Sequence, residues 1–397
     1  MEDKNSQILR LGIAGLGGAA RQMIPAAKKH PKIKITAAAD VDKDALNAFV
    51  NDSKAVAFSE VESMCSADDV DAVYIATPTH LHTEHALSAI NNGKHVLLEK
   101  PMATTLDDAE KIIQAAESAN VQLVVCSPHS LAPPTQAIIK ILHEGKLGQL
   151  KMVHSWFYSD WIYRPRTPEE LDPDPDLGGG VVFRQGPHQF DMLRTICGGA
   201  VRSLSAMVGT WDSSRPVPGS YSVFLRFENN ICATAVYNGY DHFHTTELTF
   251  DSGTQNNSTY GRARKIAQGN QKENELSRKR AGRYGGGAPL PLEKNIPAFS
   301  WISDLLMVVS GDKGEIRVTP NSIVIYGEQA IEKLALPTEQ TGRDGLISQL
   351  YYAITDNVKP SHDGRWGKAT LEISLAVIES SIQRKEVGLK HQVASDY

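Results

Sequence analysis

The chain has 397 residues, with 41 lysines and arginines, 46 aspartates and glutamates and a formal net charge of −5. At about 150 residues per domain this length predicts two or three domains, and a content of 41% hydrophobic and 22% charged residues excludes a disordered, collagenous or coiled-coil chain. The acidic balance argues against general nucleic-acid binding, because contacts with phosphates require a basic surface.

The first seven residues, Met1 to Gln7, are polar and include acidic side chains. They lack the basic start and the long apolar stretch of a signal peptide. No apolar run in the chain approaches the ~18 residues that predict a membrane helix. We therefore expect a cytoplasmic protein that does not bind membranes.

Short apolar runs alternate with amphipathic stretches over the first 126 residues. This alternation is typical of repeated βαβ units and of a parallel sheet covered by helices. One helix is expected from His82 to Gly93, and another begins at Thr105, where Asp108 gives a capping-box-like start. The predicted strands are Ile8 to Ala14, Ile33 to Asp40, Ala72 to Thr77, His95 to Glu99 and Val121 to Cys126.

After a helix predicted from Thr135 to Glu144, strands follow one another with few helices between them. This pattern predicts one large, open and mostly antiparallel sheet in an α+β domain. Further helices are expected after Gly186 and over Gly345 to Asn357 and Lys368 to Lys385. The predicted strands are Met152 to Tyr158, Tyr221 to Phe227, Ile231 to Tyr237, Thr246 to Phe250, Leu305 to Val309, Glu315 to Thr319 and Ser322 to Tyr326.

A polar insertion spans about residues 253–297 and is too long for a simple hairpin loop. Between Arg262 and Lys294 it carries nine basic residues against three acidic ones. It is interpreted either as a solvated loop or as an arginine-rich lid or subunit-contact arm. Nucleic-acid binding by this segment is disfavoured within so acidic a protein.

A glycine-rich turn between the first strand and the first helix has the pattern Gly15-x-Gly17-x-x-Ala20. Gly15 allows the tight turn, Gly17 lets the backbone approach a pyrophosphate, and Ala20 permits close packing of helix on strand. Asp40, at the end of the second strand, can bind the adenosine ribose and would repel a 2′-phosphate, so we expect NAD rather than NADP. The alternative is a glycine-rich turn in an α/β protein that binds no nucleotide.

Metal binding is not expected. His80, His82 and His85 are close in sequence, but only helix positions three or four apart share a face, so core or cofactor-wall histidines are favoured over ligands. The cysteines are widely spaced with no C-x-x-C pair, which predicts core thiols. They are Cys65, Cys126, Cys197 and Cys232.

Two further segments carry groups suited to proton transfer. Glu99-Lys100-Pro101 lies at a strand end, where proline favours an extended Lys100 whose ammonium can point at a ligand beyond the sheet. Pro187 marks a helix start with His188 just inside it, and the helix dipole disfavours the imidazolium there, so that the ring can accept a proton. Asp191 can share the face of His188. The alternatives are a solvated surface lysine and a histidine bound to backbone.

These segments occur in the order and spacing of one family. Gly15 to Ala20, Asp40, Thr77-Pro78 with His82, Gly93 to Pro101 and Gly186-x-His188-x-x-Asp191 together resemble the Gfo/Idh/MocA oxidoreductases over essentially the whole chain. The resemblance implies a Rossmann NAD-binding domain over residues 1–128. It also implies a substrate-binding α+β domain over 129–397, whose open sheet makes a homodimer or homotetramer.

The same resemblance implies roles for single residues. Lys100 and His188 would serve proton transfer and the binding of a substrate hydroxyl. The implied cofactor-binding residues are Gly15, Leu16, Gly17, Gly18, Ala19, Asp40, Thr77, Pro78, His82, Glu99 and Lys100.

One position departs from the family pattern. The family usually has an acid four residues before the histidine, and this chain has Arg184 there. An arginine lowers the pKa of a nearby histidine and offers a planar fork to a carboxylate. The tail, especially His362 to Glu372, resembles the phthalate 4,5-cis-dihydrodiol dehydrogenase subgroup, whose substrate carries two carboxylates.

The sequence therefore predicts an NAD-dependent dehydrogenase that takes a hydride from a carbinol carbon of a carboxylated cyclic diol. His188 would remove the hydroxyl proton while Lys100 holds the oxygen. The predicted substrate-binding residues are Arg184, Asp191, Arg164 and Tyr163, with Arg166 a weaker candidate. A sugar or inositol dehydrogenase, a non-catalytic NAD-binding regulator and an NAD-dependent glycosidase remain as alternatives.

Overall fold

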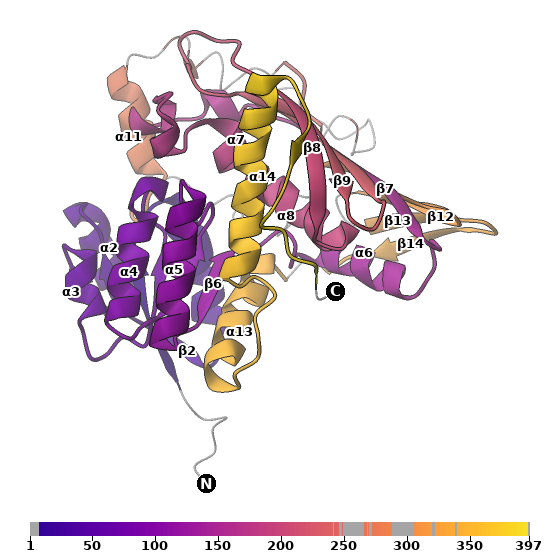
Figure 1. The fold of residues 1–397 in the computed structure, drawn as a ribbon. Coiled ribbons are helices and arrows are strands. Elements are labelled where there is room, and N and C mark those ends of the chain that lie inside the picture. Colours follow the sequence, from indigo (N-terminus) through magenta and orange to yellow (C-terminus); the bar gives the residue numbers. More distant parts are fainter. Residues whose placement is uncertain are drawn as a thin grey trace. The chain divides into compact units, whose positions relative to one another are not determined.

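The computed structural model describes residues 8–240, 242–245, 248, 266–267, 269, 272–287, 305–319, 322–337 and 340–395. It divides into two compact units (Figure 1). The first unit contains residues 1–127, 277–291 and 343–371, and the second contains 128–276, 292–342 and 372–397. The expected boundary at residue 128 lies one residue from this division, but two later segments also belong to the first unit.

The first unit is built on six parallel strands in the order β3-β2-β1-β4-β5-β6. This order reverses between β1 and β4, and ligands of such sheets bind at that point, beyond the carboxyl ends of the strands. The strands are β1 Leu9–Ala14, β2 Ile33–Ala39, β3 Val56–Phe58, β4 Ala72–Ile75, β5 His95–Glu99 and β6 Leu123–Cys126.

Two helices of this unit begin where a side chain satisfies their first N–H groups. Asp42 caps α2 by accepting from the N–H groups of Asp44 and Ala45, and Thr105 caps α5 by accepting from Asp108 N–H. Alanine, isoleucine and methionine residues on the inner helix faces are buried. The helices are α1 Gly18–Lys29, α2 Lys43–Ser53, α3 Val61–Cys65, η2 Thr79–Leu81, α4 His82–Asn91, α5 Leu106–Ala119 and α13 Gly342–Thr355.

The second unit is built on nine strands in the order β14-β13-β12-β11-β7-β10-β9-β8-β15. The pair β7 and β10 is parallel, and the other neighbouring pairs are antiparallel. The strands are β7 Leu150–Tyr158, β8 Val201–Gly209, β9 Ser220–Phe227, β10 Cys232–Asn238, β11 Leu306–Gly311, β12 Gly314–Val318, β13 Ser322–Gly327, β14 Ile331–Ala335 and β15 Val387–Gly388.

Helices α6 and α8 pack against this sheet, with α8 crossing β7 and β10 and α6 reaching β13. Burial alternates along the strands, as in β10, where every second residue is buried. Helices α11 and α14 each contain residues of both units. The other elements are α6 Pro133–His143, η3 Trp161–Tyr163, η4 Glu169–Leu171, η5 Pro175–Leu177, α7 Gly180–Arg184, α8 Gly186–Cys197, α11 Lys272–Ala281 and α14 Gly364–Gln383.

The predicted fold class is confirmed: a parallel Rossmann sheet is followed by a large, mostly antiparallel sheet. Strand β8 was not predicted, because its alternation is irregular, and neither were the exposed strand β14 and the short β3 and β15. Of the strand predicted over residues 246–250 the structure describes only Leu248, which is helical, and the other four residues lie outside the described ones. The basic insertion contains helix α11, so its described part is more ordered than a simple loop.

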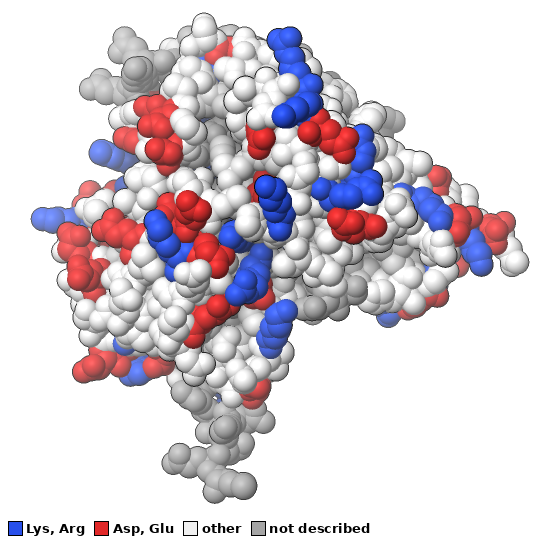
Figure 2. All heavy atoms as spheres, in the orientation of Figure 1, with Lys and Arg blue, Asp and Glu red and all other residues white. Residues whose placement is uncertain are grey.

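The four cysteines are free thiols, three of them buried, as predicted. Among the helices that the structure describes, none has the length and hydropathy of a membrane span. Figure 2 shows basic and acidic side chains interspersed on the visible face.

Candidate functional site

The glycine-rich turn has the shape that a dinucleotide pyrophosphate requires. Gly15 has a φ of +87°, and a Cβ there would lie 2.8 Å from the carbonyl oxygen of Ala76, so only glycine fits. A Cβ at Gly17 or Gly18 would meet nothing within 4 Å. The open space faces the N-terminus of the 12-residue helix α1, where backbone N–H groups and the helix dipole favour an anion. These residues therefore fit the expected cofactor.

Asp40 directly follows β2 and is bonded to the same turn. Its Oδ2 accepts from the N–H of Leu16 at 2.6 Å, and its Oδ1 accepts from the N–H of Asp42 at 2.8 Å. An ionised carboxylate has about four acceptor sites, so two remain for ribose hydroxyls. The structure thus brings the glycine-rich turn and the predicted ribose-binding acid together.

His82 joins the ends of two neighbouring strands. Its side chain is buried, with Nδ1 2.9 Å from the carbonyl oxygen of Pro101 and Nε2 3.0 Å from that of Thr77. Because both partners are acceptors, a neutral ring can donate to only one of them at a time. Thr77 Oγ1 lies 2.9 Å from Nδ1 of His85, whose pKa is lowered by burial. Among the residues that the structure describes, no group of histidine, cysteine and acidic side chains could hold a metal ion.

Lys100 follows β5 at the same edge of the sheet, and its peptide bond to Pro101 is cis. The preceding Glu99 is fixed by Tyr74, whose hydroxyl donates to Oε1 at 2.6 Å, and by the N–H of Lys100, which donates to Oε2 at 3.3 Å. Burial raises the pKa of Tyr74 well above its usual value, and the charge of Glu99 adds to this. Tyr74 therefore stays a hydrogen-bond donor. No sequence pattern distinguishes Tyr74 from an ordinary strand residue, so sequence analysis did not predict its role.

In the second unit, His188 lies in the first turn of α8. Gln189, the next residue, is buried and fixes this turn to the sheet. Its Nε2 donates to Oγ of Ser155 at 2.6 Å, and its Oε1 accepts from the hydroxyl of Tyr221 at 2.7 Å. Asp191, one turn further along α8, is 1% exposed. The helix start that sequence predicted is thus held at a fixed place above β7 and β9.

A second histidine lies against His188. The ring of His129 is 4.5 Å from that of His188, centroid to centroid, with an interplanar angle of 79°. Sequence analysis missed His129, although it follows β6 closely, where residues of the strand ends gather. Two imidazoles at this distance can influence each other's protonation.

Arg184, the position that departs from the family pattern, lies in the second unit with Arg166 and Glu170. We call these three residues the arginine cluster. Burial lowers the pKa of Arg184 and lowers that of Arg166 to about 10, while the charge of Glu170 raises both values. Arg166 Nη1 is 3.8 Å from Glu170 Oε1, and its guanidinium carbon lies 3.7 Å from the ring centroid of Trp161. Arg166 and Arg184 are both partly buried, and Glu170 is the acidic side chain whose charge acts on both of them.

The other two predicted substrate-binding residues have partners within the second unit. The hydroxyl of Tyr163 donates to Asp212 Oδ2 at 2.8 Å, and its ring is buried. Arg164 Nε donates to Asp160 Oδ1 at 2.7 Å, and this arginine is half exposed.

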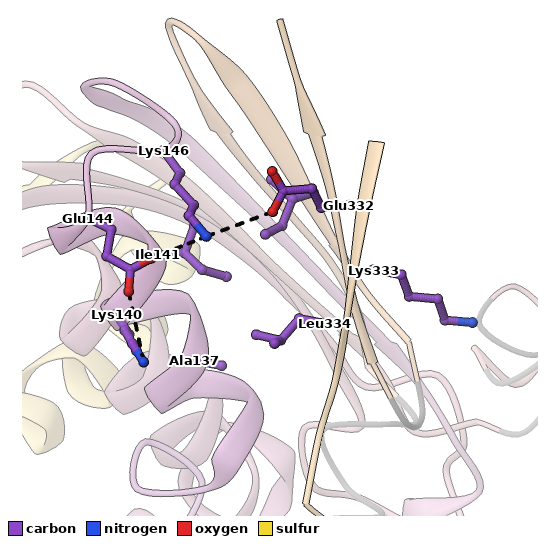
Figure 3. Close-up of a pocket in the computed structure, with 9 residues that line it drawn as sticks. Ala137, Lys140, Ile141, Glu144, Lys146, Glu332, Lys333 and Leu334 are labelled. Carbon is purple, nitrogen blue, oxygen red and sulfur yellow. Dashed lines mark ion pairs between the residues drawn. The ribbon is translucent and has the colours of Figure 1, made fainter. Parts of the chain in front are cut away.

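A groove elsewhere on the second unit is lined by α6, β13 and β14 (Figure 3). Lys146 crosses it, with Nζ 3.3 Å from Glu144 Oε2 and 3.8 Å from Glu332 Oε2. None of the predicted site residues lines this groove. Its walls combine these exposed ion pairs with the apolar side chains of Ala137, Ile141, Ile325 and Leu334.

Models of protein families match both units. Residues 9–127 match the oxidoreductase family with an NAD-binding Rossmann fold, and residues 135–255 match the GFO/IDH/MocA C-terminal domain.

Proteins of known name or structure are similar over nearly the whole chain. The 1-carboxy-3-chloro-3,4-dihydroxycyclohexa-1,5-diene dehydrogenase of Comamonas testosteroni is 33% identical over 383 residues, which cover 94% of each chain. A Bordetella bronchiseptica protein assigned to the dehydrogenases has a solved structure with a TM-score of 0.86 and 33% identity, covering 96% of this chain and 100% of that one. The WlbA dehydrogenase of Bordetella pertussis, solved with NADH and UDP-GlcNAcA, shares the fold at 20% identity and a TM-score of 0.68, covering 97% and 99% of the two chains.

Proposed function

We propose that this chain, which belongs to the Gfo/Idh/MocA family of NAD-binding oxidoreductases, oxidises a secondary alcohol of a carboxylated cyclic diol. The observation that carries this proposal is the arginine cluster, in which the partly buried Arg166 pairs with Glu170 at 3.8 Å and the partly buried Arg184 lies within range of the same charge. A buried cation is stable when an anion pairs with it, and a planar guanidinium matches a carboxylate with two parallel hydrogen bonds. A substrate carboxylate would complete the charge balance of the cluster.

The similar enzyme of Comamonas testosteroni supports the same substrate class, since its name describes a ring that carries a carboxylate and two hydroxyls. We propose phthalate cis-4,5-dihydrodiol, or a related carboxylated dihydrodiol, as the substrate. Loss of two hydrogens from such a ring gives an aromatic catechol, which makes oxidation the downhill direction.

His188 is the proposed proton acceptor for the reacting hydroxyl. Its place in the first turn of α8 favours the neutral ring, and the neighbouring His129 opposes a second positive charge. Gln189 positions the ring by anchoring the helix start. The proton leaves the substrate oxygen and passes to a ring nitrogen of His188.

Lys100 is the proposed ligand of the substrate oxygen, where its ammonium stabilises the developing negative charge. Tyr74 and Glu99 position it by fixing the end of β5. When bound, NAD supplies the acceptor for the hydride that leaves the carbinol carbon. Asp191, Arg164 and Tyr163 complete the proposed substrate-binding set.

The nine-stranded sheet is the proposed contact between subunits of a homodimer or homotetramer. Its outward face exposes large apolar side chains, including Trp156 on β7, which is 44% exposed, and Met207 on β8, which is 75% exposed. Exposed apolar patches of this kind mark contact surfaces. Sedimentation of the purified chain tests this part of the proposal. A cytoplasmic location stays a prediction.

The function is tested by following NADH formation with the purified chain, NAD and a panel of substrates. The panel contains phthalate cis-4,5-dihydrodiol, a monocarboxylated dihydrodiol, the uncharged benzene cis-dihydrodiol, myo-inositol and glucose. We expect turnover with the carboxylated diols and a much lower kcat/KM with the uncharged diol. Preferred turnover of inositol or glucose would replace the proposal with a polyol dehydrogenase. NAD binding without turnover of any compound would favour the regulator.

A further inference from the structure

Part of the basic insertion packs against the nucleotide-binding end of the first unit. We define the strap as residues 283–285, the turn that follows helix α11. All three residues belong to the first unit. The strap is far from the Rossmann strands in sequence, and the positions it touches lie between residues 16 and 52.

The strap contacts both sides of Asp40. The N–H of Tyr284 donates to the carbonyl oxygen of Leu16 at 3.2 Å, and Arg283 Nη1 donates to Asp42 Oδ2 at 2.9 Å. Leu16 and Asp42 are the two residues whose own N–H groups bind the carboxylate of Asp40. The strap therefore borders the place where the adenosine ribose is bound in such folds.

Two further contacts hold the strap against helix α2. The hydroxyl of Tyr284 donates to Asp52 Oδ2 at 2.9 Å, and its ring meets that of Phe49 edge-on, with centroids 5.1 Å apart. Gly285 has a φ of +72°, and a Cβ there would lie 2.5 Å from the Cβ of Ala48. The close approach to α2 thus requires glycine at this position. Tyr284 and Gly285 are directed to α2, which leaves Arg283 as the strap's cation at the rim.

We propose that the strap is a wall of the nucleotide site and that Arg283 binds the adenosine half of the dinucleotide. The side chain of Arg283 is 32% exposed and is fixed by Asp42, so its guanidinium is held in place but accessible. A guanidinium plane can stack on an aromatic base and still donate to a carboxylate in its own plane. Asp42 supplies that carboxylate, and adenine supplies the base. Tyr284 is a positioning residue, since it acts through Arg283.

The experiment measures dissociation constants by calorimetry with the full chain and with fragments of the cofactor. ADP-ribose reports on the adenosine half, nicotinamide mononucleotide on the other half, and NAD on both. The variants are Arg283→Ala, Arg283→Lys and Tyr284→Phe. Arg280→Ala is the matched control, because Arg280 carries the same charge on the same segment and is exposed.

For Arg283→Ala we expect the affinity for ADP-ribose and for NAD to fall about fivefold to tenfold, with the affinity for nicotinamide mononucleotide unchanged. Arg283→Lys keeps the charge but loses the planar group, and an intermediate loss is expected. Tyr284→Phe should give a smaller loss for the same two ligands. Arg280→Ala should bind all three ligands as the unchanged chain does.

Three results would overturn the proposal. The first is an affinity for ADP-ribose that Arg283→Ala and Arg283→Lys leave unchanged. The second is an equal loss for both fragments, which would indicate a general loosening of the unit, and the unfolding midpoint of the ligand-free variant checks this. The third is a loss of affinity confined to NADP, titrated in the same way as the other ligands. It would make Arg283 a ligand of a 2′-phosphate and not of adenosine.

Discussion

The carboxylate of Asp40 accepts a hydrogen bond of 2.6 Å from the backbone N–H of Leu16, so the acid after β2 also fixes the glycine-rich turn after β1. The same side chain therefore shapes the turn and, in our prediction, also binds ribose. Substitutions at this position should reveal both of them.

Asp40→Ala is expected to weaken NAD binding about tenfold and to narrow the preference for NAD over NADP. The affinity for NAD falls because ribose contacts and the support of Leu16 are lost together, while loss of the negative charge helps a 2′-phosphate. Dissociation constants for NAD and NADP measure both effects. An unchanged ratio of the two constants would show that discrimination lies elsewhere.

Lys100→Ala and His188→Ala are each expected to lower kcat by about 10²-fold or more, with the dissociation constant for NAD nearly unchanged. The reason is that the main proposed role of each side chain is at the reacting oxygen. Steady-state kinetics and NAD titration of both variants make the measurement. Full turnover in either variant would remove that residue from the mechanism.

Arg184→Gln is expected to raise KM for a carboxylated diol, with a loss of kcat/KM of about 10²-fold, and to change turnover of an uncharged diol little. Arg184→Asp should abolish turnover of dianionic substrates, because it places a like charge beside the carboxylate. The matched comparison is Arg202→Gln, since Arg202 is an exposed arginine of the second unit that lies outside the proposed substrate-binding set. Equal losses on charged and uncharged diols would contradict the carboxylate role.

Gln189→Leu is expected to destabilise the second unit by about 2 kcal/mol, because buried groups of Ser155 and Tyr221 lose their partner. It should also lower kcat more than it raises KM, since His188 loses the anchor beside it. Thermal unfolding and kinetics of the same preparation separate the two effects. Tyr221→Phe, which removes only the hydrogen bond to Gln189 Oε1 and leaves the bonds to Ser155, is the milder control. A stable variant with unchanged kcat would show that Gln189 does not position His188.

Loss of the Arg10–Asp71 pair at low pH should make the first unit less stable in acid. Burial of Asp71 works against ionisation, but hydrogen bonds from Arg10 outweigh it and lower the pKa of the carboxyl. Arg10 donates through its N–H at 2.8 Å and its Nε at 3.0 Å. A lowered folded-state pKa gives stability above the unfolded value of about 3.9, which is lost as the pH falls through the folded value.

Asp71→Asn tests this pair. Its free energy of unfolding at neutral pH should be lower than that of the unchanged chain. The difference should be on the order of 1 kcal/mol, because both groups are partly exposed. The two free energies should converge as the pH falls from the unfolded value of about 3.9 through the lowered folded-state pKa, where the carboxyl becomes protonated. A difference that stays constant over this range would contradict the assignment.

The sequence by itself determined the Rossmann half of the fold. Gly15, Gly17 and Asp40 occupy positions set by one turn and two adjacent strands, so their spacing alone predicts where they meet. The start of α8 before His188 was equally predictable from the local sequence, because Pro187 favours a first helical turn whatever lies around it. Such features depend on dihedral angles and on neighbours close in the chain.

Only the tertiary structure decided the contacts between distant segments. The approach of Arg283 to Asp42 joins residues 241 positions apart, and no local pattern encodes it. The same holds for the ring of His129 beside that of His188. These contacts form because the strand order and the packing within each unit bring distant segments together, and hydrophobic periodicity states which face is buried but not what is buried against it.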